Sequence, residues 1–302
     1  MAGEHNDSEL ESVRIGPETE KLNVHAWLSN WYEAHQLDDP SLETRYTTCR
    51  ILEESGIPCV VWHEDALRYY GVKTGLFDIY ILVPDVLKAT ETLVHRGYNL
   101  VPAKPLDKAR ISETMDIAQR LKIPGVSNNR AHLGIDPADV LLSPMKDWDF
   151  TLPVTSSPRP SFIPPLPDLN EILLDKWLDN FDIESGFRMR LAYYLGYLSS
   201  YIPVYWSHEF AQILRLDHRQ YHADLLSGMT MFTEPCRQHQ RKIRDLIRTG
   251  QYELCECSAS KENEWLFTDA VAARLLAKMS RVNTSSGNKD PSMEELVHDD
   301  EG

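Results

Sequence analysis

Short apolar runs that alternate with helix-type segments restrict the fold of this chain more than any other feature. Two runs have the length and composition of buried strands: IPCVVW at residues 57–62 and FDIYILV at residues 77–83. The segment between them, EDALRYYG at residues 64–71, has acids in its first turn and a glycine at its end, as short helices do. Buried strands joined by helices predict an α/β layer around a mainly buried sheet.

The same alternation continues on both sides of these runs. DPSLETRYTTCRILEES, residues 39–55, predicts a helix with a cap residue at its start. Pro84 is expected in the first turn of a helix over DVLKATETLVHRG, residues 85–97. YNLV at residues 98–101 and DVLLS at residues 139–143 are further candidate strands.

The pattern changes in the middle of the chain. Residues 151–168 are rich in proline, which removes backbone donors and fixes φ, so we expect a linker that is neither helix nor central strand. Beyond the linker the apolar residues recur at helical spacing. The sequence therefore predicts an α+β protein, with an α/β domain over residues 22–150 and a helical domain over residues 169–281.

The expected helical domain has clear start signals. Ser207 is expected to cap one helix over residues 208–226, and Thr233 is expected to cap another over residues 234–249. A last helix is expected over residues 261–280. Since each of these segments has an apolar face to bury, a helical bundle is the simplest arrangement.

Charge and composition limit the classes of partner. Residues 1–20 and 282–302 are polar and acidic, and we expect them to be disordered tails. The formal charge of the chain is −15, and an acidic body disfavours a broad contact with nucleic-acid phosphates. No apolar run approaches the roughly 20 residues of a membrane-spanning helix, and the N-terminus lacks the apolar segment of a signal peptide. Five scattered cysteines fit a reducing compartment, so we expect an intracellular protein of the cytoplasm or nucleus.

Asp78 is an unusual residue for an apolar strand. Residues two apart share a face of a strand, so Asp78 and Tyr80 are expected on one side, and Phe77, Ile79 and Ile81 on the other. A lone carboxylate in the core of a sheet costs much free energy. We therefore expect Asp78 to lie near the end of the strand or to have a partner.

The segment GIPCVVWHEDALRYYGVKTGLFDIYILV, residues 56–83, resembles the opening of the nucleotidyltransferase fold. The resemblance is to the minimal and antibiotic-modifying type, including fungal members, and it covers about residues 51–101. In that family a strand ends in a Gly-Gly or Gly-Ser turn, and a short helix ends in an aromatic-Gly-Val motif. A later strand carries two acids separated by one residue. Here YYGV matches the motif and Asp78 falls on the first acid, which implies a nucleotidyltransferase-like domain with a mixed sheet.

The departures from the family pattern predict a loss of activity. Family members use the two strand acids, and usually a third acid on a later strand, to hold divalent metals that bridge a triphosphate. Tyr80 stands at the second acid position, and a neutral phenol is a poor ligand for Mg²⁺. His63 and Glu64 stand at the glycine turn, where their side chains obstruct the approach of a phosphate. The third acid is Asp139 or, as the alternative, Asp136.

Four interpretations of Asp78 stay open at this point. It is a structural acid at the end of a strand, a remnant of a metal site in a domain that only binds, or part of an active transferase. The fourth interpretation is a new site in which Asp78 clusters with His63, Glu64 and Asp65.

These observations predict a degenerate nucleotidyltransferase-like protein that acts as a binding or interaction module for a protein or a small molecule. One alternative is a divergent transferase of a small molecule or protein, with Asp78, Glu64 and Asp139 as its catalytic residues. In that case Asp78 binds the metal, and the cofactors are Mg²⁺ and a nucleoside triphosphate; otherwise we expect no cofactor. The other alternative is an interaction protein that uses its helical half and acidic tails. The candidate residues for contact with a cofactor are His63, Tyr80, Arg241 and Arg244.

Three smaller motifs complete the candidate chemistry. Four arginines lie on one face of the helix expected at residues 234–249, and they either contact phosphate or pair with acids. His218 and His222 are four residues apart, so both could meet a metal from one helix, with His208 and Asp224 as further ligands. The CEC motif at residues 255–257 is too tight and isolated for a zinc site, and we expect free thiols there.

Overall fold

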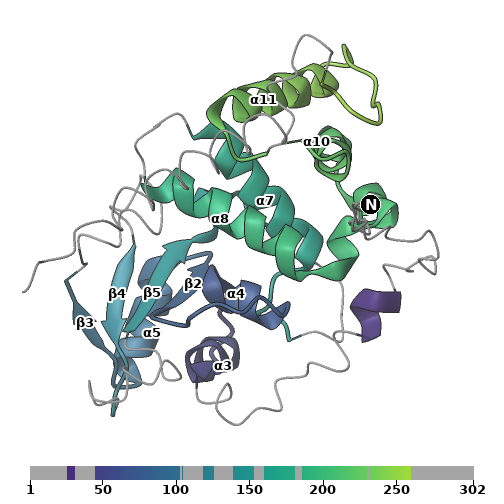
Figure 1. The fold of residues 1–302 in the computed structure, drawn as a ribbon. Coiled ribbons are helices and arrows are strands. Elements are labelled where there is room, and N and C mark those ends of the chain that lie inside the picture. Colours follow the sequence, from purple (N-terminus) through teal and green to yellow (C-terminus); the bar gives the residue numbers. More distant parts are fainter. Residues whose placement is uncertain are drawn as a thin grey trace, which may run out of the picture. The chain divides into compact units, whose positions relative to one another are not determined.

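The computed structural model is α+β, with a five-stranded mixed sheet and a helical portion (Figure 1). The structure describes residues 26–30, 45–102, 104, 118–125, 139–152, 160–180, 186–229 and 231–259. The expected tails at residues 1–20 and 282–302, the helix expected over residues 261–280 and the alternative third acid Asp136 lie outside these ranges.

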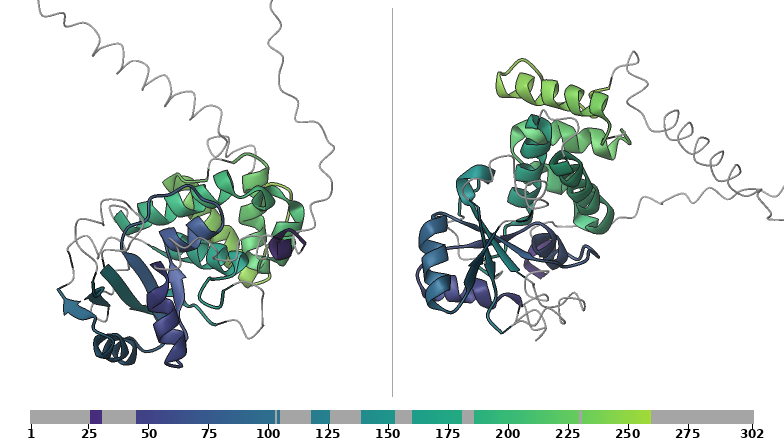
Figure 2. Two further views of the ribbon diagram at one scale, coloured as in Figure 1. Left: turned by 90° about the horizontal axis from the view of Figure 1, so that it is seen from below. Right: turned by 90° about the vertical axis from the view of Figure 1, so that its left-hand side faces the viewer.

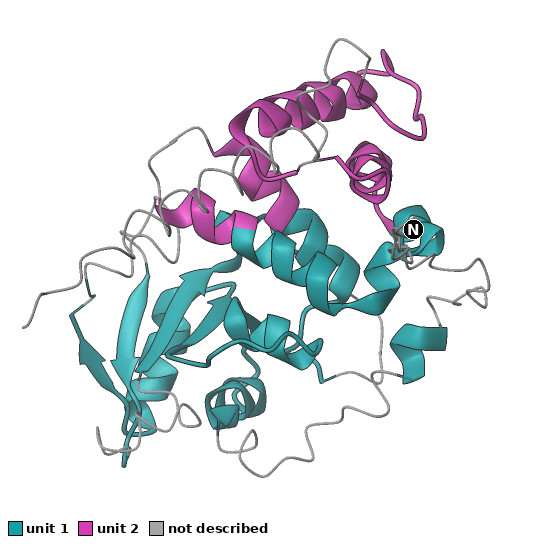
Figure 3. Ribbon diagram, in the orientation of Figure 1, with its two compact units in different colours: residues 1–172, 193–213 teal, residues 173–192, 214–302 magenta. Residues whose placement is uncertain are grey.

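The chain divides into two compact units (Figure 3). The first unit combines residues 1–172 with residues 193–213, and the second combines residues 173–192 with residues 214–302. Two of the three divisions fall within helices, α7 (Leu166–Asp179) and α8 (Gly186–Tyr201), as Figure 3 shows, and the third follows Ile213. The division at the proline-rich segment therefore stays a prediction.

The sheet belongs to the first unit and has the strand order β1-β2-β5-β4-β3. Its strands are β1 (Val60–Trp62), β2 (Ile79–Val83), β3 (Asn99–Val101), β4 (Gln119–Lys122) and β5 (Asp139–Pro144). β2 and β5 are parallel and the other three pairs are antiparallel, so the expected mixed sheet is confirmed. Every residue of β2 and β5 is buried, which explains the apolar runs Ile79–Val83 of β2 and 140–142 of β5.

The strand register brings two acids to the same end of the sheet. Ile79 pairs with Val140 across the parallel strands, so Asp78 and Asp139, which precede these two residues, are neighbours. β4 runs antiparallel beside β5 and places Arg120 opposite Leu141. The outer edge of β1 is also occupied, because the Val61 N–H donates a hydrogen bond to the carbonyl oxygen of Phe162 at 2.8 Å.

Three α-helices of the first unit lie close to the early strands in the sequence. They are α3 (Thr47–Glu54), α4 (Glu64–Tyr69) and α5 (Val86–His95). α5 packs on β3, β4 and β5 and contacts α3 (Figure 2). Asp85 is the N-cap of α5 and accepts a hydrogen bond from the Lys88 N–H at 3.0 Å. The expectation that Pro84 lies in the first turn is therefore wrong, because the helix begins after Asp85.

Two further expectations about this region are corrected. Phe77 lies before β2 and is 58% exposed, so it is not part of the buried wall that Ile79 and Ile81 form. The proline-rich segment was expected to exclude a helix, but α7 begins at Leu166 and includes Pro167. A proline is compatible with the first turn of a helix, because the N–H that it lacks has no intrahelical partner there.

The remaining elements are helical. They are the 3-10 helix η3 (Met145–Trp148), α7, α8, the 3-10 helix η4 (Pro203–Trp206), α9 (His208–Ile213), α10 (Leu216–Leu226) and α11 (Glu234–Arg248). Thr233 caps α11, and Ser207 accepts a hydrogen bond from the Phe210 N–H at the start of α9, as expected. The single helix expected over residues 208–226 is wrong, because Arg215 has an extended ψ of 146° and separates α9 from α10. Among the described helices, none is both long enough and apolar enough to cross a membrane.

Candidate functional site

The two acids at the end of the sheet meet on one guanidinium group. Nη2 of Arg120 lies 2.6 Å from Oδ2 of Asp78 and 2.5 Å from Oδ2 of Asp139. Nε of Arg120 also donates to Asp139 at 2.8 Å. Asp78 therefore has both features expected of it, since it lies just before the strand and has a partner.

Lys104 completes this group, which we call the Arg120 cluster: Asp78, Asp139, Arg120 and Lys104. Nζ of Lys104 lies 3.2 Å from Oδ2 of Asp139 and 3.9 Å from Oδ2 of Asp78. The Lys104 side chain is 55% exposed, whereas the Arg120 side chain is 1% exposed. Two carboxylates and two basic groups balance in formal charge, so the cluster needs no further cation.

The protonation of Arg120 follows from these contacts. Burial lowers the pKa of Arg120, but the hydrogen bonds to Asp139 and Asp78 and the charges of both acids raise it overall. The guanidinium therefore stays charged and holds the position between the two carboxylates.

His63 stands at the turn between β1 and α4 in a backbone conformation that favours glycine. Its φ is 57° and its ψ is −129°, and it is the N-cap residue of α4. Its ring is buried and lies 4.8 Å from the ring of Tyr80, 5.3 Å from that of Trp148 and 5.4 Å from that of Tyr194, measured between centroids. The candidate cofactor residues His63 and Tyr80 thus lie together within an aromatic core.

The two acids after His63 have partners away from Asp78. Glu64 is buried and accepts a hydrogen bond from the Tyr194 hydroxyl at 2.8 Å. Asp65 is buried and accepts two hydrogen bonds from Arg45, from Nε at 2.5 Å and from Nη2 at 2.8 Å. Of the three candidate catalytic acids, the structure brings Asp78 and Asp139 together, and Glu64 does not join them in a group of metal-ligating reach.

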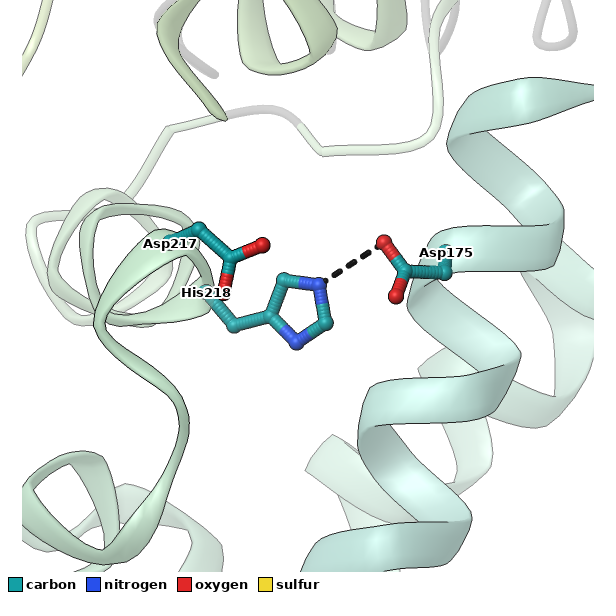
Figure 4. A group of neighbouring side chains, drawn as sticks. All are labelled: Asp175, Asp217 and His218. Carbon is teal, nitrogen blue, oxygen red and sulfur yellow. Dashed lines mark hydrogen bonds and ion pairs between the residues drawn. The ribbon is translucent and has the colours of Figure 1, made fainter. Parts of the chain in front are cut away.

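Within the described ranges, one group of three histidine, cysteine or acidic residues has its ligand atoms close enough to hold a metal. Asp175 of α7 and Asp217 and His218 of α10 each offer an atom within 4.8 Å of the others (Figure 4). Nε2 of His218 lies 2.9 Å from Oδ1 of Asp175, and the His218 side chain is fully buried. The candidate ligand His218 belongs to this group, but His208, His222 and Asp224 do not.

Three arginines already surround these carboxylates. Arg244 and Arg248 lie 2.9 Å and 3.0 Å from Oδ1 of Asp175. Arg248 also lies 2.6 Å from Asp217, and Arg215 forms ion pairs with both acids. We call these six residues the Asp175 network: Asp175, Asp217, His218, Arg215, Arg244 and Arg248. A divalent metal would have to displace guanidinium groups here, so the network is an ion-pair cluster that joins α7, α10 and α11.

The network shifts the pKa values of its acids. Burial raises the pKa of Asp175, but the hydrogen bonds and charges of His218 and Arg215 lower it well below its usual range overall. Burial also raises the pKa of Asp217, and the charge of His218 and the hydrogen bond from Arg248 lower it overall. Both acids therefore stay ionised in the folded protein at neutral pH.

The arginine face of α11 is engaged by the protein itself. Arg237 donates to Glu234 and to the carbonyl oxygen of Leu178. Arg244, a candidate cofactor residue, also lies 2.6 Å from Oδ1 of Asp179. Arg241, the other candidate, lies 3.7 Å from Asp179, and its side chain is 32% exposed. A phosphate contact at this face would compete with these carboxylates.

Arg120, Arg45 and Asp175 are important residues that reasoning from the sequence did not identify. Arg120 lies in QRLK, a short polar tetrapeptide that has no strand signal of its own. Arg45 lies just before α3 and Asp175 lies on α7, and the local sequence around neither residue indicates its ion-pair partner. These partners are 19 or more positions apart in the sequence, and no local pattern predicts contacts at such separations.

Comparisons with protein-family models, with curated proteins and with solved structures find no match for this chain.

Proposed function

We propose that this chain is a nucleotidyltransferase-like protein that has lost metal-dependent transfer and acts as a binding module. The observation that carries the proposal is the position of Arg120, whose guanidinium lies between Asp78 and Asp139. In the family that the sequence resembles, acids at such positions hold divalent metals. A buried guanidinium supplies the positive charge instead, and it cannot bridge a triphosphate to an attacking hydroxyl group as a metal does.

Two features support descent from an active enzyme. Asp78 and Asp139 are neighbours because β2 and β5 are parallel, as a shared metal site on two strands requires. His63 has a positive φ at the position where the family has a turn glycine. A non-glycine residue in this conformation is unusual, and its backbone fits a turn that once held glycine.

One helix supports the binding role. Met189, Tyr193, Tyr197 and Tyr201 recur every four residues along α8, and all four side chains are exposed. Large apolar groups on a solvent-facing helix stripe are typical of surfaces that contact other molecules. A module that binds without catalysis needs such a surface, and it does not need a metal.

Metal and nucleotide binding by the full chain test the proposal. We expect titration with Mn²⁺, followed by electron paramagnetic resonance, to show no saturable site at the Arg120 cluster. We also expect calorimetry to show no Mg²⁺-dependent binding of ATP. The proposal is overturned if ATP binds only with Mg²⁺ and Asp78→Asn abolishes that binding.

A variant tests whether the cluster is a former metal site. Arg120→Met leaves Asp78 and Asp139 facing each other without the guanidinium, and we expect this variant to gain a Mn²⁺ site. Lys104→Met is the matched control, because it removes a basic group that is exposed and leaves Arg120 in place. A folded Arg120→Met variant that binds no Mn²⁺ would count against a former metal site at these acids.

A further inference from the structure

Residues of α7, α8 and the start of α11 line a cavity of about 220 Å³. All of the lining residues belong to the second unit. They are Trp177, Arg188, Met189, Ala192, Phe232, Thr233, Glu234 and Arg237. None of them belongs to the Arg120 cluster or to the Asp175 network, so the cavity is distinct from both charged groups.

The apolar part of the lining has room for one ring. The buried ring of Trp177 lies 6.0 Å from the ring of Phe232, measured between centroids, at an interplanar angle of 72°. The side chains of Phe232 and Met189 are exposed, so the apolar wall can be reached from the solvent. An apolar cavity of about 150 Å³ in an engineered protein holds benzene. The larger cavity here can therefore hold one six-membered ring with a short substituent.

The charged part of the lining has one more positive group than negative groups. Nη1 of Arg188 lies 3.0 Å from Oε2 of Glu234, and Nη2 of Arg237 lies 2.8 Å from Oε1 of the same carboxylate. Glu234 is the only acid among the lining residues. One carboxylate thus serves two guanidinium groups, and a further anion would balance the formal charge of the lining.

Arg237 has donors that its bonds to the described residues do not use. A guanidinium group has five N–H donors. Nε and Nη2 of Arg237 donate to Glu234, and Nη1 donates to the carbonyl oxygen of Leu178 at 2.7 Å. These bonds leave one N–H on each of the two Nη atoms. The Arg237 side chain is only 5% exposed, so an acceptor in the cavity would satisfy groups that water reaches poorly.

The start of α11 adds a further preference for an anion. Thr233 is the N-cap of this 15-residue helix, and Glu234 is its first residue. The N-terminus of a helix carries a partial positive charge, equivalent to roughly half an elementary charge. The helix end and the two arginines therefore favour the same sign of ligand.

We propose that this cavity binds a small aromatic monocarboxylate, a ligand with one ring and one carboxylate group. The ring packs against Trp177, Met189 and Phe232, and the carboxylate accepts hydrogen bonds from Arg188 and Arg237. Charge-assisted hydrogen bonds from arginine are the strong contacts of such a complex. The proposal goes beyond the proposed function, because it involves no residue of the sheet and does not depend on the loss of metal-dependent transfer.

Calorimetric titration of the full chain with phenylacetate tests the proposal. Two probes with the same ring are the controls: phenylacetamide is neutral, and phenethylamine carries a positive charge. We expect phenylacetate to bind at one site per chain and phenylacetamide to bind about 10-fold more weakly or less, because charge-assisted hydrogen bonds are roughly twice as strong as neutral ones. Phenethylamine should show no saturable binding. The proposal is overturned if phenylacetate does not bind saturably, or if either control probe binds as tightly.

Variants connect this binding to the cavity. Arg188→Met should weaken the binding of phenylacetate by about 10-fold or more, because it removes a charged donor and keeps an apolar side chain. It should leave any binding of phenylacetamide nearly unchanged. Arg190→Met is the matched control on the same helix, and it should not alter phenylacetate binding, because Arg190 does not line the cavity.

Phe232→Ala provides a second variant that does not remove a charge. Because the Phe232 side chain is exposed, we expect this variant to fold, and circular dichroism verifies the fold of each variant. Phe232→Ala should weaken the binding of both phenylacetate and phenylacetamide, since both rings lose a contact. Wild-type affinity for phenylacetate in folded Arg188→Met or in folded Phe232→Ala would overturn the proposal.

Discussion

The charge balance at the end of the sheet depends on one residue, Arg120. Its guanidinium is buried at the end of the sheet, and each carboxylate beside it would repel the other without it. A buried charge is tolerated only when partners and hydrogen bonds offset its desolvation, and the two acids provide both. The same contacts that stabilise the sheet occupy the carboxylate oxygens that a metal would need.

Arg120→Met should lower the free energy of unfolding by about 3–5 kcal/mol, because it leaves two buried carboxylates without their main partner. Urea denaturation measures this change. Lys104→Met should cost about 1 kcal/mol or less, because the Lys104 side chain is largely exposed. If both variants lower the free energy of unfolding by similar amounts, burial does not determine how much each basic residue of the cluster stabilises the fold.

His63 offers a second test at a single residue. Substitution by alanine removes the packed ring and keeps the unfavourable positive φ, whereas glycine removes the ring and relieves the backbone. We therefore expect His63→Gly to be more stable than His63→Ala by about 1–2 kcal/mol in urea denaturation.

Ala66 of α4 is the matched control for this prediction. It is buried in a helix that follows His63, where glycine is unfavourable. Ala66→Gly should therefore destabilise the protein by about 1 kcal/mol. Alanine is thus favoured over glycine at position 66, whereas we expect glycine to be favoured over alanine at position 63. An alanine at position 63 that proves more stable than glycine would show that the backbone there is not strained.

Elements differ in how far the sequence predicts them. β1, β2, β3 and β5 were all predicted near their positions, because each is an apolar or β-branched run between turn signals. β4 was not predicted, because three of its four residues are polar. The break at Arg215 was also missed, since neither glycine nor proline marks it.

The residues of the candidate site were also predicted only in part. Asp78 and Asp139 were both among the candidate acids, and the strand register makes them neighbours. The residue between them, Arg120, comes from the strand that was missed. Contacts across a sheet depend on strand order, and strand order depends on packing of the whole unit.

The Asp175 network predicts how the helices of the second unit respond to acid. A carboxylate whose pKa is lower in the folded than in the unfolded protein stabilises the fold above its unfolded pKa, near 3.9. That contribution is lost as the pH falls toward the lower folded value. The pKa of Asp175 is lowered by the network, so the free energy of unfolding should decrease as the pH falls below about 4.

Asp175→Asn should remove part of this pH dependence and cost about 1.5–3 kcal/mol at neutral pH, because it weakens several charged hydrogen bonds. Chemical denaturation at a series of pH values measures both effects. Asp245→Asn is the control: its side chain is 52% exposed, and its loss should cost about 1 kcal/mol or less. An unchanged pH profile in Asp175→Asn would contradict the role of the network.

At the scale of the whole molecule, the reactivity of the cysteine thiols shows which parts of the fold are accessible to solvent. Burial and the charge of Asp224 raise the pKa of Cys236 to about 12, and burial also raises the pKa of Cys49. Of the five cysteines, we expect only Cys255 and Cys257 to react with Ellman's reagent in the native protein. All five should react after unfolding in urea, and a third fast thiol in the native protein would contradict the packing of the buried cysteines.

The Phe162 carbonyl that caps the outer edge of β1 has a consequence for self-association. An unpaired strand edge is a template for strands of other molecules, and pairing through such edges starts fibril growth. On the β1 side the Val61 N–H is already engaged. Among the described strands, β3 (Asn99–Val101) forms the opposite edge and its Leu100 is exposed, so we expect pairing between molecules to start there rather than at β1.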